Sequence, residues 1–403
     1  MNQNLKQSIE YGYNWVKKIL NIVGGRASGS EEEKKASKDA LEILKECCND
    51  TFLEKFYCHP TAFLGFIRVS VFLFLIGSLL FYFEPIISEI FLILTIILFI
   101  EKFINYHEFI DPFFPKKESY NIGGEILPIE SPNKTIYITA HMDSAYEFYL
   151  IYKNPKTVFL KIGIAISVLI FVNIISILNI LNKYNLLNVW SNDNLILIYI
   201  FILILNIPAS LLYNFTNFKP VPGAFDNLAA VGVILGIGKY LSNLKNSNSY
   251  PFRKTKVNLI IFGCEEAGLR GSKRFVKNHI EQLKKENACV INLDGINNSN
   301  IISIISKEFT IHTNHDKSLV ENFKKLLDQN NILNKIDVLD FGATDAIYFS
   351  RNKIPALSLF KVNMRPIPRF YHTRLDDISN ISVDSMLETA NAILIFIKYL
   401  DQF

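Results

Sequence analysis

The feature that most constrains this chain of 403 residues is a stretch without charge, IGIAISVLIFVNIISILNIL at 162–181. Its length is roughly the ~20 residues that a helix needs to cross the hydrocarbon core of a bilayer. A second stretch, LILIYIFILILNIPASLLY at 195–213, is of similar length, and Pro208 lies near its end, where a membrane helix tolerates proline. Together these stretches predict a transmembrane hairpin.

Two earlier apolar stretches are shorter, VSVFLFLIGSLLFYF at 69–83 and IISEIFLILTIILFI at 86–100. They predict another transmembrane hairpin. The charged residues at their edges are expected at the membrane interface: Arg68, Glu84, Glu89 and Glu101. A hydrophobic fraction of 50% with 32 Phe exceeds what a soluble core usually requires. The alternative is that these segments are buried helices of a large soluble core.

Basic residues near the helix ends predict the orientation, because Lys and Arg are retained on the cytoplasmic side. The two short hairpin turns hold Lys183 alone. The flanks that join the apolar stretches to the rest of the chain hold many more: Lys55, Arg68, Lys102, Lys116, Lys117, Lys153, Lys156, Lys161 and Lys219. We therefore expect a multi-pass protein of the cell membrane, in contact with the lipid bilayer, whose termini and polar segments are cytoplasmic.

Composition excludes several other classes of protein. The net charge is only +4 and is spread along the chain, so no basic patch indicates nucleic-acid binding. The 5 cysteines show no C-x-x-C spacing, which argues against a disulfide scaffold or a thiolate zinc site and fits a reducing cytoplasm. The N-terminal segment MNQNLKQSIEYGYNWVKKIL lacks the apolar centre and cleavage site of a signal peptide and predicts an amphipathic helix.

The polar segments left after removing both hairpins predict one domain built from separate pieces. We expect an N-terminal helical part, a first hairpin, the first part of an α/β core, a second hairpin and the main α/β core, at residues 1–60, 61–106, 107–155, 156–213 and 214–403. In the first piece, GSEEEKKASKDALEILKECC has a Ser before acidic residues and helical apolar spacing, which is typical of an N-capped helix.

Strands and helices alternate along the last piece, which predicts an α/β fold. KVNLIIF, ACVINL and IPALSLF read as strands, and TIYITA is a further strand in the middle piece. GAFDNLAAVGVILGIGKYL, GSKRFVKNHIEQL, SLVENFKKLLDQN and SVDSMLETANAILIFIKYL read as helices. The expected architecture is a mostly parallel mixed sheet sandwiched by helices, with the two hairpins inserted. Ligands on such sheets collect at the carboxyl ends of the strands.

Candidate metal ligands lie at such strand ends. They are two imidazoles and three carboxylates: His141 after TIYITA, Asp226 at the start of a helix, Glu266 and Asp294 at strand ends, and His372 in a late loop. This set suits Zn²⁺, with Mn²⁺ or Co²⁺ as alternatives. If one carboxylate bridges, each of two metals receives three protein ligands, which predicts a two-metal hydrolytic site.

Each of these short motifs also has an ordinary reading. An isolated H-x-D is usually a surface turn, FDN is a helix cap, and paired glutamates are usually solvated. Their occurrence at successive strand ends favours a common site. The other histidines carry no such pattern: His59, His107, His279, His312 and His315. The glycines of GVILGIGKY lie inside a helical pattern and do not form a phosphate loop.

The ordered motifs AHMDS, PGAFDNLAAVG, CEEAGLRGS, NLDG and YHT resemble the zinc-dependent aminopeptidases of metallopeptidase family twenty-eight. This family also contains glutaminyl cyclases and transferrin-receptor-like proteins. RASGSEEEKKA and GATDAIYFSRNKIPALSL resemble family segments too, so the resemblance extends over nearly all of the polar sequence. It implies a zinc-exopeptidase fold, of the phosphorylase/hydrolase-like type.

The resemblance also implies a role for each residue of the site. His141 and Asp294 would bind one zinc ion, Glu266 and His372 the other, and Asp226 would bridge them. Glu265 would be the general base for the attacking water. Asp143 would orient His141, as metal-bound imidazoles usually require.

In one respect the chain departs from the family pattern. His141 and Asp226 lie close in sequence in the family, whereas here the whole second hairpin separates them. The links from Asp143 to Lys156 and from Tyr213 to Asp226 reach at most about 40 Å, at ~3.3 Å per extended residue. We therefore expect the site near the membrane surface and hypothesise a peptide substrate presented at or near the bilayer.

The leading interpretation is a membrane-anchored di-zinc aminopeptidase. One alternative is a relative of the glutaminyl cyclases that uses one zinc ion. A non-catalytic receptor or scaffold is disfavoured because no ligand is replaced and Glu265 is present. A transporter is disfavoured because the apolar segments show no charge pair or inverted repeat. Residue specificity and oligomeric state stay open at this point.

Overall fold

The computed structural model describes residues 3–402, and the chain divides into two compact units. The sheet unit comprises residues 3–60, 115–146 and 220–402. The helical unit comprises Thr61–Phe114 and Glu147–Lys219. Each unit is therefore assembled from pieces that are separated in sequence by parts of the other unit.

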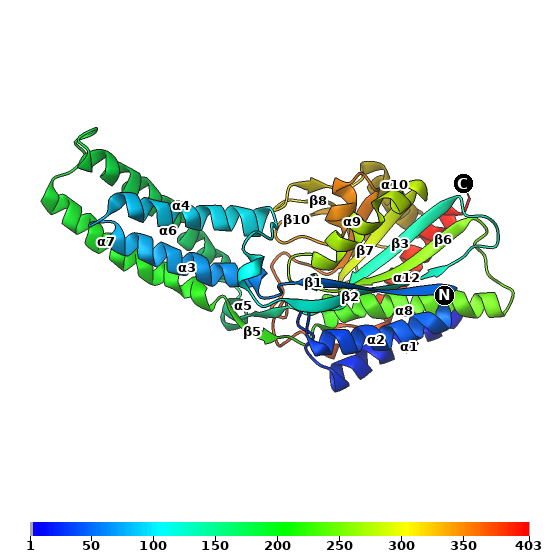
Figure 1. The fold of residues 1–403 in the computed structure, drawn as a ribbon. Helices are drawn as coiled ribbons and strands as arrows, with labels where there is room; N and C mark the ends of the chain where they lie inside the picture. Colours follow the sequence, from blue (N-terminus) through cyan, green and yellow to red (C-terminus); the bar gives the residue numbers. More distant parts are fainter. Residues whose placement is uncertain (1–2, 403) are drawn as a thin grey trace. The chain divides into compact units, whose positions relative to one another are not determined.

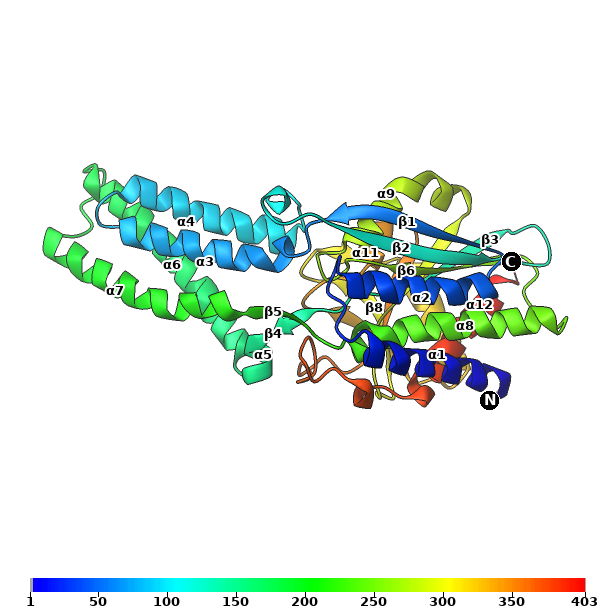
Figure 2. The same cartoon turned by 60° about the horizontal axis from the view of Figure 1, so that its bottom comes forward.

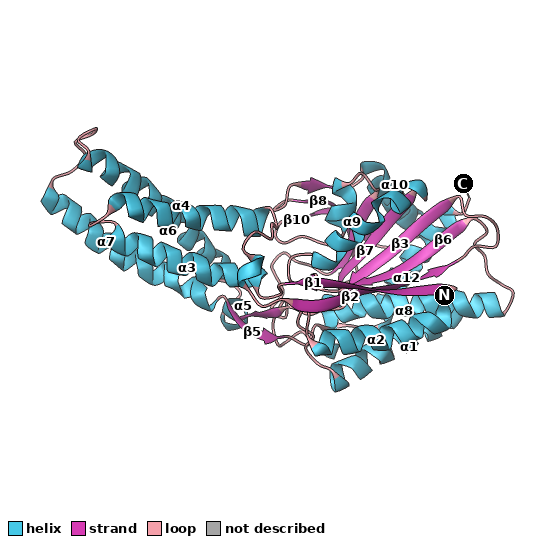
Figure 3. Cartoon of the chain, viewed as in Figure 1, coloured by secondary structure: helices cyan, strands magenta, loops and turns pink. Residues whose placement is uncertain are grey.

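A mixed sheet forms the centre of the sheet unit (Figure 3). Its central strands β6, β3, β7 and β11 are parallel neighbours, while β2 and β8 join this group antiparallel. In spatial order the strands are β1 (Asp50–Cys58), β2 (Lys117–Ile126), β6 (Thr255–Phe262), β3 (Lys134–His141), β7 (Ala288–Ile296), β11 (Ala356–Lys361), β8 (Ile302–Glu308) and β10 (Asn334–Leu339), with β9 (Thr313–Asn314) paired to β8.

Helices cover both faces of this sheet. Figure 2 shows α1, α2 and α8 on one side of the strands. That side is covered by α1 (Gln3–Ile22), α2 (Glu31–Cys47), α8 (Ala229–Asn246), α10 (Lys317–Gln329) and α12 (Val383–Leu400). The other side carries α9 (Arg270–Lys285) and α11 (Ala346–Arg351). The predicted α/β sandwich is confirmed.

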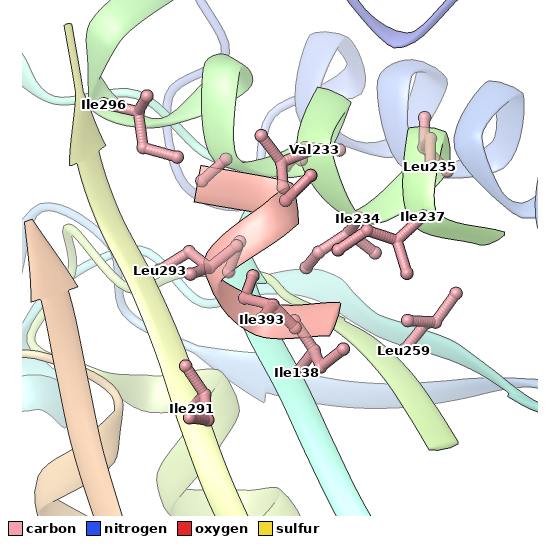
Figure 4. Close-up of a cluster of buried hydrophobic side chains, with 14 of the residues drawn as sticks. Ile138, Val233, Ile234, Leu235, Ile237, Leu259, Ile291, Leu293, Ile296 and Ile393 are labelled. Atoms are coloured by element: carbon pink, nitrogen blue, oxygen red, sulfur yellow. The ribbon is translucent and has the colours of Figure 1, made fainter. Parts of the chain in front are cut away.

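The main core lies between the sheet and the larger helical layer. Ile138, Leu259 and Ile291 from three strands face Ile234 of α8 and Ile393 of α12 (Figure 4). All of these side chains are fully buried. Burying each one is worth about 1.5–3 kcal/mol, so the contact between α8 and the strands is a main source of stability.

The predicted cap of α2 is present. Ser30 precedes the helix, and its hydroxyl accepts a hydrogen bond from the backbone N–H of Glu33 at 3.1 Å. Glu31, Glu32 and Glu33 in the first turn complement the positive end of the helix dipole. The strands β1, β2, β8 and β10 have no counterpart among the strands expected from the sequence.

The helical unit is built around four long helices, labelled in Figure 1. They are α3 (Ala62–Leu80), α4 (Pro85–Phe99), α6 (Val158–Lys183) and α7 (Asn192–Ser210), and a π-helical turn, Ile100–Ile104, prolongs α4. Shorter elements complete the unit: the 3₁₀ turns Asp111–Phe113 and Leu211–Asn214, α5 (Tyr149–Lys153) and the paired strands β4 (Tyr146–Phe148) and β5 (Thr216–Pro220).

Large apolar side chains cover the outer surface of these helices. Phe72, Ile93, Ile174 and Leu197 are all exposed, which is the reverse of a helix bundle in water. Within residues 3–402, four segments are long and apolar enough to cross a membrane, and three of them lie here, at Ala62–Leu80, Val158–Lys183 and Asn192–Asn214. The helices are thus compatible with membrane association.

The fourth segment of this kind is Ala224–Asn246 in the sheet unit, and 89% of its most apolar window is buried by protein. It contains α8, so its hydrophobicity serves the core. The expected segment at 86–100 corresponds to α4, which has 15 residues before its π-helical turn. Glu89, expected at the membrane interface, is only 7% exposed and lies on the protein-facing side of α4.

Candidate metal centre

The candidate ligands converge at the carboxyl edge of the parallel strands. His141 is the last residue of β3, and its register partner Phe262 is the last residue of the parallel neighbour β6. Glu265 and Glu266 follow β6 in the next loop, while Asp294 lies near the end of β7. Because parallel strands end at the same edge, side chains from three separate motifs meet there.

The carboxylate of Asp226 lies between the two imidazoles. Its Oδ1 is 3.2 Å from His141 Nε2, and its Oδ2 is 2.9 Å from His372 Nε2. Asp226 sits in an irregular turn, Ala224–Leu228, that follows Gly223. Gly223 has a φ of 64°, a left-handed conformation that glycine adopts without steric cost.

Each imidazole has further carboxylates beside it. His372 Nε2 lies 3.4 Å from Glu266 Oε1, while His141 Nε2 lies 3.9 Å from both Asp294 Oδ1 and Glu265 Oε2. Among the described residues, two groups of side chains have ligand atoms within 4.8 Å of one another: His141, Asp226 and Glu266, and His141, Glu265 and Asp294. The structure therefore brings together all five ligands expected from the sequence, and it places Glu265, the expected general base, beside them.

Asp143 contacts His141 through its backbone. His141 Nδ1 lies 3.0 Å from the Asp143 carbonyl oxygen, to which it donates, and 3.6 Å from the Asp143 carboxylate. That carboxylate instead accepts hydrogen bonds from the backbone N–H groups of Glu265 and Glu266, each at 3.0 Å, and from the Ser28 hydroxyl at 2.5 Å. Asp143 thus fixes the glutamate pair as well as the imidazole.

The cluster concentrates negative charge in a buried place. Burial and neighbouring carboxylates raise the pKa of Glu265, Glu266 and Asp294 well above the usual range. Burial opposes a charge on His141, but the surrounding carboxylates raise its pKa nevertheless. Burial also opposes the ionisation of Asp226, yet the two imidazoles lower its pKa.

These residues fit zinc. The side chains of the cluster are each at most about a tenth exposed: His141, Asp226, Glu265, Glu266, Asp294 and His372. Burying charged groups in this way costs several kcal/mol for each charge that is not compensated. Glu266 Oε1 is buried and accepts no hydrogen bond from the described residues, so its lone pairs are free to bind a cation. Imidazole nitrogen and carboxylate oxygen are ordinary Zn²⁺ ligands, and bound cations would neutralise the excess charge.

Several supporting residues were not expected from the sequence. Arg26 is fully buried and donates to the carbonyl oxygens of Met142 at 2.9 Å and of Pro222 at 2.7 Å. Asp376 accepts from the backbone N–H groups of Phe225 and Asp226, at 2.8 and 3.1 Å. Arg26 belongs to the RASGSEEEKKA segment, whose resemblance to the family could have pointed to it. Asp376 belongs to none of the motifs that resemble the family.

Two further buried carboxyl groups lie close enough to the centre to influence its charge. Burial raises the pKa of Asp345 to about 7. The negative charge of Asp345, when ionised, further raises the pKa of Glu265 and of Asp294. Burial, followed by the charge of Asp143, raises the pKa of Glu33 to about 8. Both belong to segments that carried the family resemblance, GATDAIYFSRNKIPALSL and RASGSEEEKKA, but neither was assigned a role.

Solved structures share this fold. The Bacillus subtilis zinc aminopeptidase BSAP aligns with 97% of this chain over 95% of its own length, with 13% identity and a TM-score of 0.55. The Legionella pneumophila LapA aminopeptidase aligns with 100% of this chain over 74% of its own length, with 13% identity and a TM-score of 0.54. A glutaminyl cyclase from an Acidobacteriales bacterium aligns with 98% of this chain over 95% of its own length, with 12% identity and a TM-score of 0.57.

None of the curated proteins is significantly similar in sequence. The family model described as "Peptidase family M28" matches residues 212–397. With the α/β sheet and the imidazole–carboxylate cluster at its edge, this match defines the chain as a zinc-dependent metallopeptidase. The particular likeness is to peptidase family M28, whose model covers 186 of the 403 residues of the chain.

Proposed function

We propose that this chain is a di-zinc aminopeptidase, anchored in the membrane, with its catalytic unit in the cytoplasm. The observation that carries the two-zinc assignment is the position of Asp226, whose two oxygens face different imidazoles. Beyond that shared carboxylate, His141 has Asp294 beside it and His372 has Glu266. The set divides into two groups of three ligands that share one carboxylate, as in two-metal hydrolytic sites.

Bound zinc would polarise the scissile carbonyl and make a water molecule acidic enough to attack at neutral pH. Glu265 is the protein group suited to move the proton, because its carboxylate is buried beside the cluster and belongs to neither ligand group of the proposal. It takes the proton of the attacking water and passes it to the departing amine. Asp143 positions Glu265 by accepting its backbone N–H.

Metal counting with matched variants tests this proposal. The purified chain is stripped with a chelator and titrated with Zn²⁺, while hydrolysis of aminoacyl amides is followed. We expect activity to require two ions per chain. Glu265→Gln should retain both ions and lose roughly 10²–10⁴-fold in turnover, whereas Glu266→Gln should lose one ion.

A second candidate function is favoured by the likeness to a glutaminyl cyclase structure. One ion per chain, together with cyclisation of peptides that begin with glutamine, would favour this transferase over the peptidase. Two ions with release of N-terminal residues would exclude it. Binding of zinc without turnover of either substrate would indicate a non-catalytic receptor on the same fold.

The exposed apolar surface of the helical unit supports anchoring in the bilayer. We further propose that the substrate is a peptide presented at the membrane. After reconstitution in vesicles, kcat/KM is compared for one peptide in free form and with a lipid tail at its C-terminus. The lipid-tailed peptide should be the better substrate, and equal values would remove this part of the proposal.

A further inference from the structure

The helical unit buries one carboxylate that forms no ion pair with the described residues. Glu89 on α4 is 7% exposed, and neither of its carboxylate oxygens accepts a hydrogen bond in the described chain. An ionisable side chain inside a membrane bundle is costly and usually marks a functional site. This group lies outside the metal centre, and the peptidase reaction proposed above does not use it.

Hydrogen bonds set the helices around Glu89 in register. The Asn179 side-chain amide of α6 donates to the Phe81 carbonyl oxygen at the end of α3, at 2.8 Å. Both helices run toward their hairpin turns, so Ser176 and Ser78, each three residues earlier, come to the same level. The Ser88 hydroxyl donates to the Gly77 carbonyl oxygen at 2.7 Å, which brings Glu89 to that level as well.

The polar side chains near this level offer oxygen atoms as acceptors. Among the described residues, Ser78 Oγ is buried without a hydrogen-bond partner, and the buried Ser176 hydroxyl lies beside the Glu89 carboxylate. Asn173, one turn earlier on α6, donates its amide N–H to the Leu169 carbonyl oxygen at 2.7 Å. Its Oδ1 is buried and accepts no hydrogen bond from the part of the chain that the structure describes. We call Ser78, Glu89, Asn173 and Ser176 the inner polar cluster.

Buried charges elsewhere in the unit have protein partners. Lys102 forms an ion pair with Asp111, and both are almost fully buried. The Glu147 carboxylate accepts a hydrogen bond from the Asn217 amide. Within the described part of the helical unit, these pairs leave the Glu89 carboxylate without a buried basic side chain beside it.

We propose that the inner polar cluster binds a hard monovalent cation such as Na⁺. Oxygen donors from a carboxylate, two hydroxyls and an amide carbonyl suit a hard ion, and no imidazole or thiolate is present to favour zinc. One carboxylate balances one positive charge, whereas Ca²⁺ sites in proteins generally gather several carboxylates. The cation ties α3, α4 and α6 together. This site is independent of the peptidase function.

Thermal unfolding of the full chain in detergent tests the site. The unfolding midpoint is measured in increasing NaCl, LiCl or KCl, with choline chloride holding the ionic strength constant. An alkali cation should raise the wild-type midpoint saturably by several degrees relative to choline. Glu89→Gln should abolish this rise. Glu84→Gln, which removes an exposed carboxylate just before α4, should retain it.

A second variant covers the case in which Glu89→Gln does not fold. Ser176→Ala removes one neutral ligand and should raise the half-saturating cation concentration several-fold, as measured by equilibrium binding of radioactive sodium to the purified chain. The proposal is overturned if alkali cations and choline act alike on the wild type. It is also overturned if Glu89→Gln keeps the cation effect. The burial of Glu89 would then be explained by a protonated, uncharged carboxyl group and not by a bound cation.

Discussion

Asp376 illustrates how a residue that touches no metal can still control the site. Its carboxylate accepts the backbone N–H groups of Phe225 and Asp226, so it fixes the turn that places Asp226 between the imidazoles. In Asp376→Asn an amide N–H₂ would replace one acceptor and face a donor. We expect zinc affinity to fall about 10- to 100-fold, as for other residues that orient metal ligands.

Competition with a zinc-chelating dye measures this affinity on the purified chain. Asp377→Asn is the matched control, because the neighbouring carboxylate is exposed and accepts hydrogen bonds from the nearby Ser379. It should bind zinc as the wild type does. An unchanged affinity in Asp376→Asn would show that the turn holds its shape without this carboxylate.

Glu33 should make the stability of the metal-free protein depend on pH. Burial raises its pKa from 4.5 to about 8, although its carboxylate accepts hydrogen bonds from Gly29 N, Ser119 Oγ and Cys264 N. Between these two pH values the folded chain keeps a proton that the unfolded chain has lost. Its contribution therefore makes the free energy of unfolding fall as pH rises through this window.

Glu33→Gln removes that proton uptake, so the decline in stability between about pH 4.5 and pH 8 should become shallower. Denaturant unfolding of the chelator-treated chain at several pH values within the window provides the measurement. Glu32→Gln, which changes an exposed carboxylate one residue away, should follow the wild-type curve. Parallel curves for wild type and Glu33→Gln would contradict the assignment.

At the residue scale, the sequence predicted the ligands better than their supports. His141, Glu266 and Asp294 each lie in a short motif at the end of a strand. Predicting the strands was therefore enough to expect these three residues at one edge of the sheet. The contacts of Arg26 join residues that are 116 and 196 positions apart in the chain. Such bonds depend on how the loops fold over one another, and no local pattern of residues encodes them.

At the element scale, glycines decide how closely α1 and α8 pack. A Cβ atom on Gly12 of α1 would lie 2.1 Å from the backbone oxygen of Gly232 on α8. Backbone cannot retreat as a flexible side chain can, so Gly12→Ala must push the helices apart. We expect a loss of about 1–3 kcal/mol in the free energy of unfolding, measured with denaturant.

Gly163→Ala is the matched control for this prediction. Gly163 is also inside a helix, α6, but a Cβ atom there would meet nothing within 4 Å. Because alanine favours a helix over glycine by up to about 1 kcal/mol, stability should stay constant or rise slightly. Equal losses in both variants would attribute the effect to the helices themselves and not to their contact.

Helices with clear caps and periodicity, and strands buried on both faces, were predictable from the sequence. The glycines of α8 were correctly read as part of a helix and not as a phosphate loop. The edge strands were not expected. β1, DTFLEKFYC, is mostly half-buried or exposed and carries charges, so it lacks the continuous apolar run of a central strand. Its identity depends on pairing with β2, which lies beyond the whole first helical hairpin.

At the scale of the whole molecule, the second helical insertion begins and ends, in sequence, close to residues of the metal centre. The sheet unit is left after Tyr146, shortly past Asp143, and is re-entered at Pro220, shortly before Asp226. Within the sheet unit these ends are joined: Ser144 Oγ donates to the Val221 carbonyl oxygen at 2.8 Å, and Val221 N donates to the Ala145 carbonyl oxygen at 3.0 Å. This junction lets an insertion interrupt the catalytic sequence while the ligands stay in place.

The proposed orientation leads to a test on intact cells with a thiol reagent that does not cross membranes. Leu187→Cys places a thiol in the exposed turn between α6 and α7, and Phe309→Cys places one on the exposed surface of the sheet unit. If both hairpins cross the bilayer and the sheet unit is cytoplasmic, the reagent should modify Leu187→Cys only. After the cells are lysed, it should modify both variants.

The native cysteines cause little background, because Cys47, Cys58 and Cys264 are buried and all five would lie on the protected side. The wild-type chain measures whatever labelling remains. Modification of Phe309→Cys but not Leu187→Cys in intact cells would reverse the orientation and place the peptidase outside the cytoplasm. Modification of both would mean that α6 and α7 do not cross the bilayer, and the apolar surface of the helical unit would then need a protein partner to cover it.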